Sequence, residues 1–265
     1  MPHSLSRRGQ FFQMDILITG AASRLGQILA AHLAPDHKLR LFDRTSVAAS
    51  ENSEALQGDL RDPDTAWRAV RGVDAIVHTG EPPQDLPADE LERQQFLLDW
   101  ATRGTHVLCS AAVEAGVKRL VYGSTLEIFE TYPDDRYISE LWKPLPTPEM
   151  ASMSRYLGEL TCREFVRDHL IDTTALRLGK LVLEEEVADR EPDLMWLDLR
   201  DAAQAFACAL GRATSKAANW TSHWALFHIC AAIPNAKYLI DNARSMGYEP
   251  QHNFARHWPV REAST

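Results

Sequence analysis

Residues 15–43 read DILITGAASRLGQILAAHLAPDHKLRLFD, and they contain two apolar runs separated by a glycine turn and an amphipathic segment. The first run, Ile16 to Ile18, is typical of a buried strand. The segment after Gly20 repeats apolar residues at helical spacing, and the second run ends at Asp43. This order predicts a strand, a helix and a second strand, which together make one βαβ unit.

The turn between the first strand and the helix has the features of a pyrophosphate site. Gly20 permits a tight turn, and Gly26 lets the helix lie close to the sheet. Backbone N–H groups at the start of the helix, from Ser23 through Arg24 and Leu25, can face a phosphate. A chance pair of glycines in an ordinary βαβ unit is the alternative, and the strand and helix context argues against it.

Ser23 and Asp43 refine this prediction. Ser23 stands where the G-x-x-G-x-x-G pattern has its middle glycine. Its hydroxyl can donate to a phosphate, but its Cβ limits how closely the backbone approaches. Asp43 ends the second strand about 20 residues after the turn, where a carboxylate accepts hydrogen bonds from an adenosine ribose. We therefore predict a dinucleotide site.

Composition and charge exclude several other classes of protein. The net charge of −9 over 265 residues argues against a nucleic-acid surface, which needs clustered Lys and Arg. No apolar run approaches the length of a membrane-spanning helix. The four cysteines are widely spaced and lack a C-x-x-C pattern, which favours free thiols in the cytoplasm over metal ligands. We expect no metal site.

The alternation of strand and helix signals predicts a Rossmann-type α/β fold, a doubly wound and mostly parallel sheet with helices on both faces. Expected strands are residues 55–57, 75–78, 119–122, 173–178, 195–197 and 226–229. Expected helices are residues 63–70, 89–102, 105–115, 151–168, 200–210 and 235–246. We expect a disordered extension over 1–13, a dinucleotide-binding domain over 14–180, and a small C-terminal cap over 181–265 integrated with it. The acidic residues 184–186 are expected to be solvated and structural rather than metal-binding.

Several short motifs resemble the extended short-chain dehydrogenase/reductase superfamily, in its NAD-dependent epimerase/dehydratase group. They are TGAA at 19–22, GDL at 58–60, VDAIVH at 73–78, GVKR at 116–119, ALRLG at 175–179 and GYEP at 247–250. HTG at 78–80 and the segment around Trp196 before Asp201 are most similar to the uronate dehydrogenase branch. The resemblance implies an oxidoreductase for a sugar-like or other polyhydroxylated small molecule. It also implies a homodimer through the helices at 105–115 and 151–168.

The resemblance also implies roles for individual residues. Asp59 and Leu60 match the pair that contacts adenine, and Thr79 and Gly80 match the backbone beside the nicotinamide. Thr125, preceded by Ser124, falls where the family keeps a catalytic Ser or Thr. Arg177 matches an arginine near the substrate carboxylate, a task that suits a planar guanidinium. A salt bridge at the end of a strand is the alternative for this arginine.

The chain departs from the family at its catalytic motif, Tyr-x-x-x-Lys. Alignment on Gly158-Glu159 puts Ala151 at the tyrosine and Arg155 at the lysine, and no Y-x-x-x-K occurs elsewhere in the chain. Alanine has no transferable proton, whereas arginine keeps the positive charge in another geometry. The candidates to replace the missing groups are Arg155, Thr125, Glu127 and, beside the cleft, Glu81. Tyr156 is expected to pack, and His78 to be a satisfied strand-end histidine.

Two functions follow from this departure. The first is an NAD-dependent oxidoreductase with an atypical active site, and the second is a catalytically silent dinucleotide-binding protein. Asp43 would repel a 2′-phosphate, so NAD is favoured over NADP. Arg24 and Arg44 leave NADP open, because either side chain could reach a phosphate.

Overall fold

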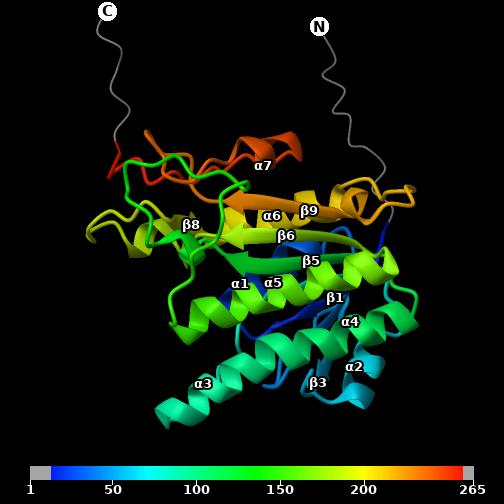
Figure 1. Cartoon of the computed structure of the whole chain (residues 1–265). Coiled ribbons are helices and arrows are strands. Elements are labelled where there is room, and N and C mark those ends of the chain that lie inside the picture. The colour runs from blue at the N-terminus through cyan, green and yellow to red at the C-terminus, as the bar shows by residue number, and fades with distance from the viewer. Residues whose placement is uncertain (1–12, 259–265) are drawn as a thin grey trace, which may run out of the picture.

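The computed structural model describes residues 13–258, and a seven-stranded parallel sheet forms its centre (Figure 1). The strand order is β3-β2-β1-β4-β5-β6-β9. The bounds are β1 Asp15–Thr19, β2 Lys38–Asp43, β3 Ser53–Gln57, β4 Ala75–His78, β5 Arg119–Thr125, β6 Asp172–Leu178 and β9 Trp224–Ile229. This confirms the doubly wound fold. The expected N-terminal extension lies, apart from Gln13, outside the described residues.

Helices cover both faces of the sheet. Neighbouring residues of a strand point to opposite faces, so the apolar strands present side chains on both faces for helices to cover. In β1, Ile16 and Ile18 face one apolar core and Leu17 faces the other. The first core lies under α1 (Arg24–Leu33), α6 (Leu199–Gly211) and α7 (Asp241–Ser245). The second lies under α2 (Pro63–Val70), α4 (Thr105–Glu114) and α5 (Met150–His169). Helix α5 is in front of the sheet in Figure 1. The apolar stripes of α4 and α5 thus face their own sheet.

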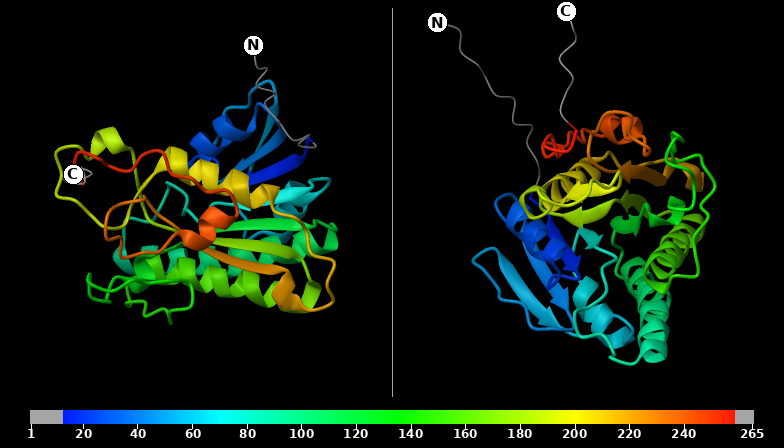
Figure 2. Two further views of the ribbon diagram at one scale, coloured as in Figure 1. Left: turned by 90° about the horizontal axis from the view of Figure 1, so that it is seen from above. Right: turned by 90° about the vertical axis from the view of Figure 1, so that its left-hand side faces the viewer.

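The C-terminal part of the chain completes this sheet. After β6, a small parallel pair forms from β7 (Lys180–Val182) and β8 (Trp196–Asp198). The chain then packs α6 against α1 and adds β9 beside β6. Residues 181–258 are therefore more than a cap, since they supply one strand and one covering helix of the central layer (Figure 2).

The expected helix at 235–246 is wrong over its first half. Only α7, Asp241–Ser245, is helical. Asn235 has a left-handed backbone with φ of +54°, and the following segment pairs with Ile138 instead. The backbone N–H of Ile138 donates to Lys237 O at 2.7 Å, and that of Leu239 donates to Ile138 O at 2.9 Å. These long-range bonds replace the helical ones.

A further difference concerns the length of one helix. The expected helix at 89–102 is α3 (Glu90–Asp99) followed by a wider turn, Trp100–Gly104, that runs into α4.

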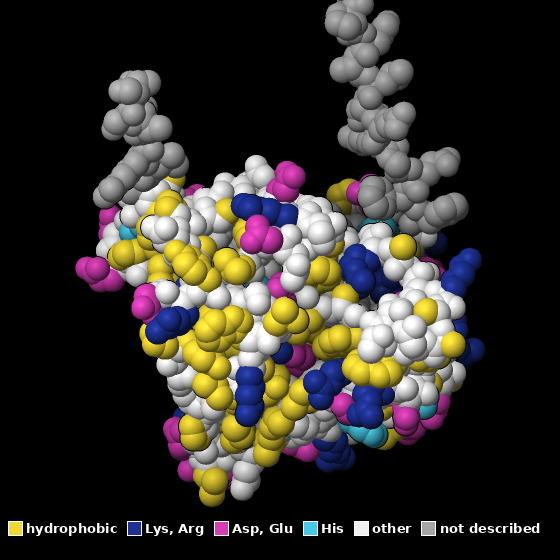
Figure 3. All heavy atoms as spheres, turned by 45° about the horizontal axis from the view of Figure 1, so that its top comes forward, with side chains coloured by type: hydrophobic (Ala, Val, Ile, Leu, Met, Phe, Trp, Pro, Cys, Tyr) yellow, Lys and Arg dark blue, Asp and Glu magenta, His cyan; other side chains and the backbone are white. Residues whose placement is uncertain are grey.

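No helix among residues 13–258 is long and apolar enough to cross a membrane. On the face drawn in Figure 3, Lys and Arg side chains stand among acidic and apolar ones rather than in a continuous stripe.

Candidate active site

The glycine loop is preformed at the C-terminal edge of the sheet, which faces the viewer on the right of Figure 2. Gly20 has a φ of +71°, and a Cβ there would overlap the Thr79 hydroxyl. Ser23 caps α1, because its Oγ accepts from Gly26 N at 3.0 Å and donates to Gly20 O at 2.7 Å. The hydroxyl proton of Ser23 is therefore used within the loop rather than aimed outward to a phosphate.

Asp43 lies beside the loop, as the sequence predicted. It is 3% exposed. Its Oδ2 accepts from Ala22 N at 3.0 Å, and its Oδ1 accepts from the N and Oγ1 of Thr45 at 3.0 and 3.1 Å. A carboxylate has about four lone-pair positions, so these bonds leave little capacity for a ribose hydroxyl. In this structure the main role of the Asp43 side chain is to hold the end of β2 against the glycine loop.

The predicted adenine side is dominated by ion pairs. Leu60 is buried in the core, while Asp59 pairs with Arg61 at 2.7 Å and with Arg44 at 3.6 Å. Burial raises the pKa of Asp59, but the hydrogen bonds and charge of Arg61 outweigh it and hold that pKa below its usual value. Arg44 also pairs with Asp85 at 3.0 Å. Arg44 is thus held by two carboxylates and is not a free phosphate ligand.

Arg24 is also engaged. Its guanidinium pairs with Glu186 at 2.7 Å, and Glu185 pairs with Arg200 of α6 at 2.8 Å. The acidic turn Glu184–Glu186 therefore links α1 and α6, while Glu185 and Glu186 stay exposed, as expected for a solvated, structural loop. Arg24 and Arg44, the two arginines that could have bound the extra phosphate of NADP, are thus both paired with carboxylates.

A cavity of about 230 Å³ lies at the start of α5, where the sequence motif aligns Ala151 with the family's tyrosine. Ala151 and Arg155 of α5 line it, together with Glu81, Glu127 and the apolar wall around Trp100. Gly80, just before Glu81, has a φ of +70°, and a Cβ there would overlap Gly123 O. The cavity is therefore bordered by two carboxylates and one guanidinium.

Arg155 is fixed from several sides. Its Nη2 donates to Ser124 O at 3.0 Å, and its Nη1 lies 3.2 Å from Glu81 Oε1 in an ion pair. Its own carbonyl accepts from the Tyr122 hydroxyl at 2.8 Å. Two buried polar atoms here, Arg155 Nε and Glu81 Oε1, have no hydrogen-bond partner in the described chain. Such atoms favour a polar ligand in the cavity.

Thr125 and Glu127 form a local pair. The Thr125 hydroxyl donates to Glu127 Oε2 at 3.2 Å and accepts from Glu127 N at 3.2 Å. Thr125 is 1% exposed and does not line the cavity, whereas Glu127 does. Thr125 therefore orients Glu127.

Arg177 is paired with the buried carboxylate of Glu159. Its Nε and Nη2 donate to the two carboxylate oxygens of Glu159 at 3.0 and 2.7 Å, and both side chains are about 5% exposed. Ser124 Oγ donates to the same carboxylate at 2.6 Å. Arg177 thus forms the buried salt bridge that the sequence left open as its alternative role, and its Nη1 is a buried atom without a hydrogen-bond partner among the described residues.

Glu159 was missed by the sequence analysis, which used it only to align the motif. Its signal was its place four residues after Arg155, on the same face of α5. The expectations for Tyr156 and His78 hold. Tyr156 packs against the first core, and burial raises its pKa. His78 bonds the hydroxyls of Thr19 and Thr105 at 2.7 and 3.0 Å, and burial lowers its pKa to about 4.

Residues 16–193 match the model of the NAD dependent epimerase/dehydratase family, and the chain belongs to this family. Within residues 13–258, no cluster of His, Cys, Asp and Glu is arranged to hold a metal ion.

Relatives within the family include several sugar dehydrogenases. An NAD-dependent glucose-6-phosphate dehydrogenase from Haloferax volcanii is 26% identical over 91% of this chain and 94% of its own. A uronate dehydrogenase from Pseudomonas syringae is 29% identical over 70% of this chain and 66% of its own. A crystal structure of uronate dehydrogenase from Agrobacterium tumefaciens has a TM-score of 0.73 at 22% identity, covering 90% of this chain and 85% of its own. That structure is a tyrosine-to-alanine variant in complex with NAD.

Proposed function

We propose that this protein is an NAD-dependent dehydrogenase of a sugar-like substrate, in which a carboxylate replaces the family's tyrosine as the proton acceptor. The observation that carries this proposal is the cavity at Ala151, bordered by Glu127, Glu81 and Arg155. The substrate class is supported by the printed activities of the relatives, which act on glucose 6-phosphate, uronates and L-arabinose.

The residues that would hold NAD lie along one edge of the sheet. The N-terminus of α1 with Gly20 suits the pyrophosphate, because its N–H groups and helix dipole favour an anion. Asp43 and the Asp59–Arg61 pair border the adenosine side, and Thr79 and Gly80 lead to the nicotinamide side. NAD is preferred over NADP because Arg24 and Arg44 are paired with acids.

NAD, when bound, supplies the hydride acceptor, and the chain must take up the substrate's hydroxyl proton. Glu127 is the proposed acceptor, because its carboxylate lines the cavity and Thr125 holds its Oε2. Arg155 supplies the positive charge that the family's lysine provides, and Ser124 O fixes its direction. Glu81 is proposed to bind a substrate hydroxyl through Oε1, the buried oxygen without a hydrogen bond in the described chain.

The test combines calorimetry with turnover. We expect NAD and NADH to bind more tightly than NADP and NADPH. Reduction of NAD is then followed by absorbance with aldoses, uronic acids and sugar phosphates. Glu127→Gln is expected to lower kcat by about 10²–10⁴-fold with little change in NAD affinity, the usual loss of a general base. Glu130→Gln, an exposed acid nearby on the same segment, is the control. Unchanged kcat in Glu127→Gln would refute its role.

A catalytically silent dinucleotide-binding protein is the second candidate, favoured by Ala151 and Arg155 at the catalytic positions. The discriminating variant is Ala151→Tyr with Arg155→Lys. If the wild type binds NAD but turns over none of the panel, and the double variant gains activity, the silent function is supported. Turnover by the wild type contradicts it, and failure of all four nucleotides to bind contradicts both functions.

We further propose a homodimer through α4 and α5 and a cytoplasmic location. Free cysteines, Cys109 and Cys162 among them, support a reducing compartment. Light scattering on the purified chain tests the dimer, and a monomer at micromolar concentration would contradict it.

A further inference from the structure

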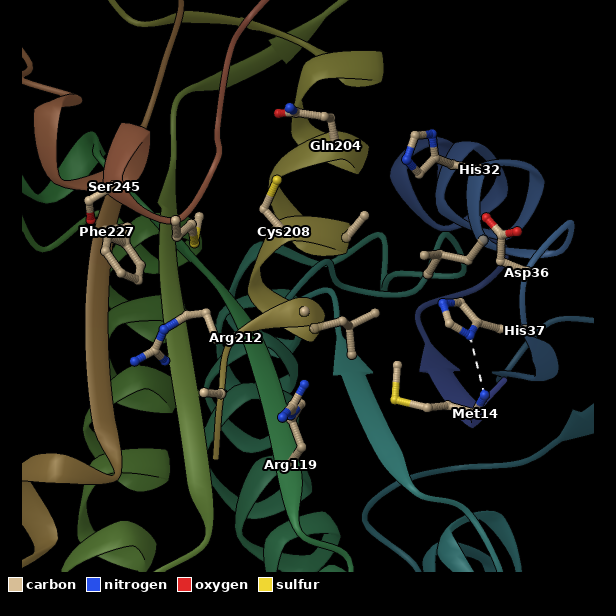
Figure 4. A pocket seen from close by; sticks show the side chains of 16 residues that line it. Met14, His32, Asp36, His37, Arg119, Gln204, Cys208, Arg212, Phe227 and Ser245 are labelled. Carbon is tan, nitrogen blue, oxygen red and sulfur yellow. Dashed lines mark hydrogen bonds between the residues drawn. The ribbon is translucent and has the colours of Figure 1, made fainter. Parts of the chain in front are cut away.

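Another cavity, of about 1090 Å³, lies at the opposite edge of the sheet from the glycine loop (Figure 4). It is bordered by Met14 just before β1, by Arg119 at the start of β5, and by the C-terminal ends of α1 and α6. β5 runs from Arg119 to Thr125, and at about 3.3 Å per residue this separates the two edges by about 20 Å. A dinucleotide at the glycine loop therefore leaves this cavity open.

Two half-buried arginines, Arg119 and Arg212, line the cavity. Arg212 donates one N–H to Thr174 Oγ1 at 2.6 Å, and its guanidinium lies over the ring of Phe227. Neither arginine forms an ion pair with a carboxylate of residues 13–258. Each guanidinium has five N–H donors, so most of these donors are available to a ligand.

The charges around these arginines do not balance. Burial lowers the pKa of both arginines, and the charge of Arg119 lowers the pKa of Arg212 further. Asp172 acts in the opposite direction on both, but its Oδ1 already accepts from Ser215 N at 3.1 Å and lies 3.1 Å from His223 Nδ1. Two partly desolvated cations thus repel each other beside the single carboxylate of Asp172.

The rest of the lining is largely apolar or neutral. Phe227 forms part of one wall and His37 stands on the α1 side (Figure 4). Met246 also lines the cavity. Burial lowers the pKa of His37, so this imidazole is neutral at pH 7. Asp36 is the single carboxylate among the lining residues, and it is exposed at the rim. The interior therefore offers two cations and an apolar wall.

We propose that Arg119 and Arg212 bind the phosphate or carboxylate group of a small organic anion, whose apolar part lies against Phe227 and Met246. Planar guanidinium groups bind both kinds of oxyanion through paired N–H donors. The volume exceeds what a bare head group needs and lies at the upper end for small-molecule sites.

Isothermal titration calorimetry tests the site with three probes, inorganic phosphate, butyl phosphate and hexanoate, at low ionic strength. Saturating NAD is present, so that the glycine loop does not contribute. We expect butyl phosphate or hexanoate to bind, and the tighter of the two identifies the preferred head group. Butyl phosphate should bind several-fold tighter than inorganic phosphate, because its chain is removed from water. Absence of binding by all three probes would overturn the proposal.

The variants are Arg119→Gln and Arg212→Gln, with Lys216→Gln as the control, an exposed cation that does not line the cavity. Each arginine variant is expected to weaken probe binding at least about 10-fold, while the control leaves it unchanged. Arg119→Lys keeps the charge without the planar fork and should give an intermediate affinity, even if the glutamine variants fold poorly. Equal affinity in the wild type and Arg119→Lys, together with unchanged binding in Arg212→Gln, would contradict the assignment.

Discussion

A single buried carboxylate, that of Glu159, joins α5 to the ends of β5 and β6. It accepts two bonds from Arg177 and one from Ser124, whose carbonyl in turn orients Arg155. Since Ser124 precedes Thr125, this network also sets the strand end that carries the proposed Thr125–Glu127 pair. The residue that holds the candidate site together thus makes no contact with the cavity itself.

Replacement of Glu159 by Gln should strongly destabilise the fold. It leaves the Arg177 charge buried without a counter-ion, which typically costs about 3–5 kcal/mol of unfolding free energy. The double variant Glu159→Gln with Arg177→Met removes both charges and should recover most of that loss. Urea denaturation measures the free energy of unfolding of the wild type and of each variant. The exposed Glu164–Arg167 pair is the control, and Glu164→Gln should cost at most about 1 kcal/mol. A similar small effect at Glu159 would contradict the argument.

At the scale of elements, the sequence predicted the βαβ unit, the strand β4 and the helix α2 because each has a local signal. For the strands and the βαβ unit these signals are an apolar run or a glycine turn, and in the structure the side chain of Asp62 caps α2. The missed features depend on distant partners. Residues 235–240 have a helix-like pattern, but their backbone pairs with Ile138 about a hundred positions earlier. The sequence could not name the salt-bridge partner of Arg177 for the same reason, since Glu159 lies on another element.

His78 joins β4 to β1 and α4 through the hydroxyls of Thr19 and Thr105, and it makes the fold sensitive to acid. Burial lowers its pKa to about 4 in the folded state, against 6.5 for an exposed histidine. Below pH 6.5 the unfolded state binds a proton that the folded state does not, so stability falls as the pH falls towards 4. The loss over this window is about 3 kcal/mol.

The measurement is the free energy of unfolding across pH 4–7, in the wild type and in His78→Asn. The variant is less stable at pH 7, but its stability should fall less steeply between pH 6.5 and 4. His228, whose pKa burial and the Arg177 charge lower to about 3, contributes a similar slope in both proteins and therefore cancels in the comparison. Parallel curves would show that His78 does not cause the dependence.

Gly158 lets α5 approach both β5 and the turn before α4. A Cβ at this position would overlap the Tyr122 hydroxyl and Ala101 O. In an exposed helix Gly→Ala stabilises by about 1 kcal/mol, but here the overlap should reverse the sign. We expect Gly158→Ala to lower the melting temperature, and Tyr122→Phe to relieve part of that loss in the double variant. An increase in melting temperature on Gly158→Ala alone would show that α5 can move outward freely.

At the scale of the whole molecule, the N- and C-terminal parts share one core. Residues from β1, α1, α6 and the final segment, Tyr248 included, belong to the same apolar cluster. β9 pairs with β6 along its whole length, from Thr173 opposite Trp224 to Leu178 opposite Ile229. The parallel strands also direct the glycine loop and the arginine-lined cavity to opposite edges, so ligands at the two places need not compete.

This shared core predicts a single unfolding transition for residues 14–180 and 181–258, because neither part can bury its apolar face alone. Tryptophans allow a direct test. In one variant every tryptophan except Trp67 and Trp100 is replaced by Phe, and in another every tryptophan except Trp196 and Trp224 is replaced. The remaining tryptophans report on the N-terminal and C-terminal parts. We expect both to unfold in urea at the same midpoint as the far-ultraviolet circular dichroism. NAD at about 100 times its Kd should stabilise both by about 2.7 kcal/mol, because it binds only the folded state. If the Trp196 and Trp224 reporters unfolded first and did not respond to NAD, the C-terminal part would be a separate unit, and the contacts of β9 and α6 would then contribute little to the stability of the nucleotide-binding sheet.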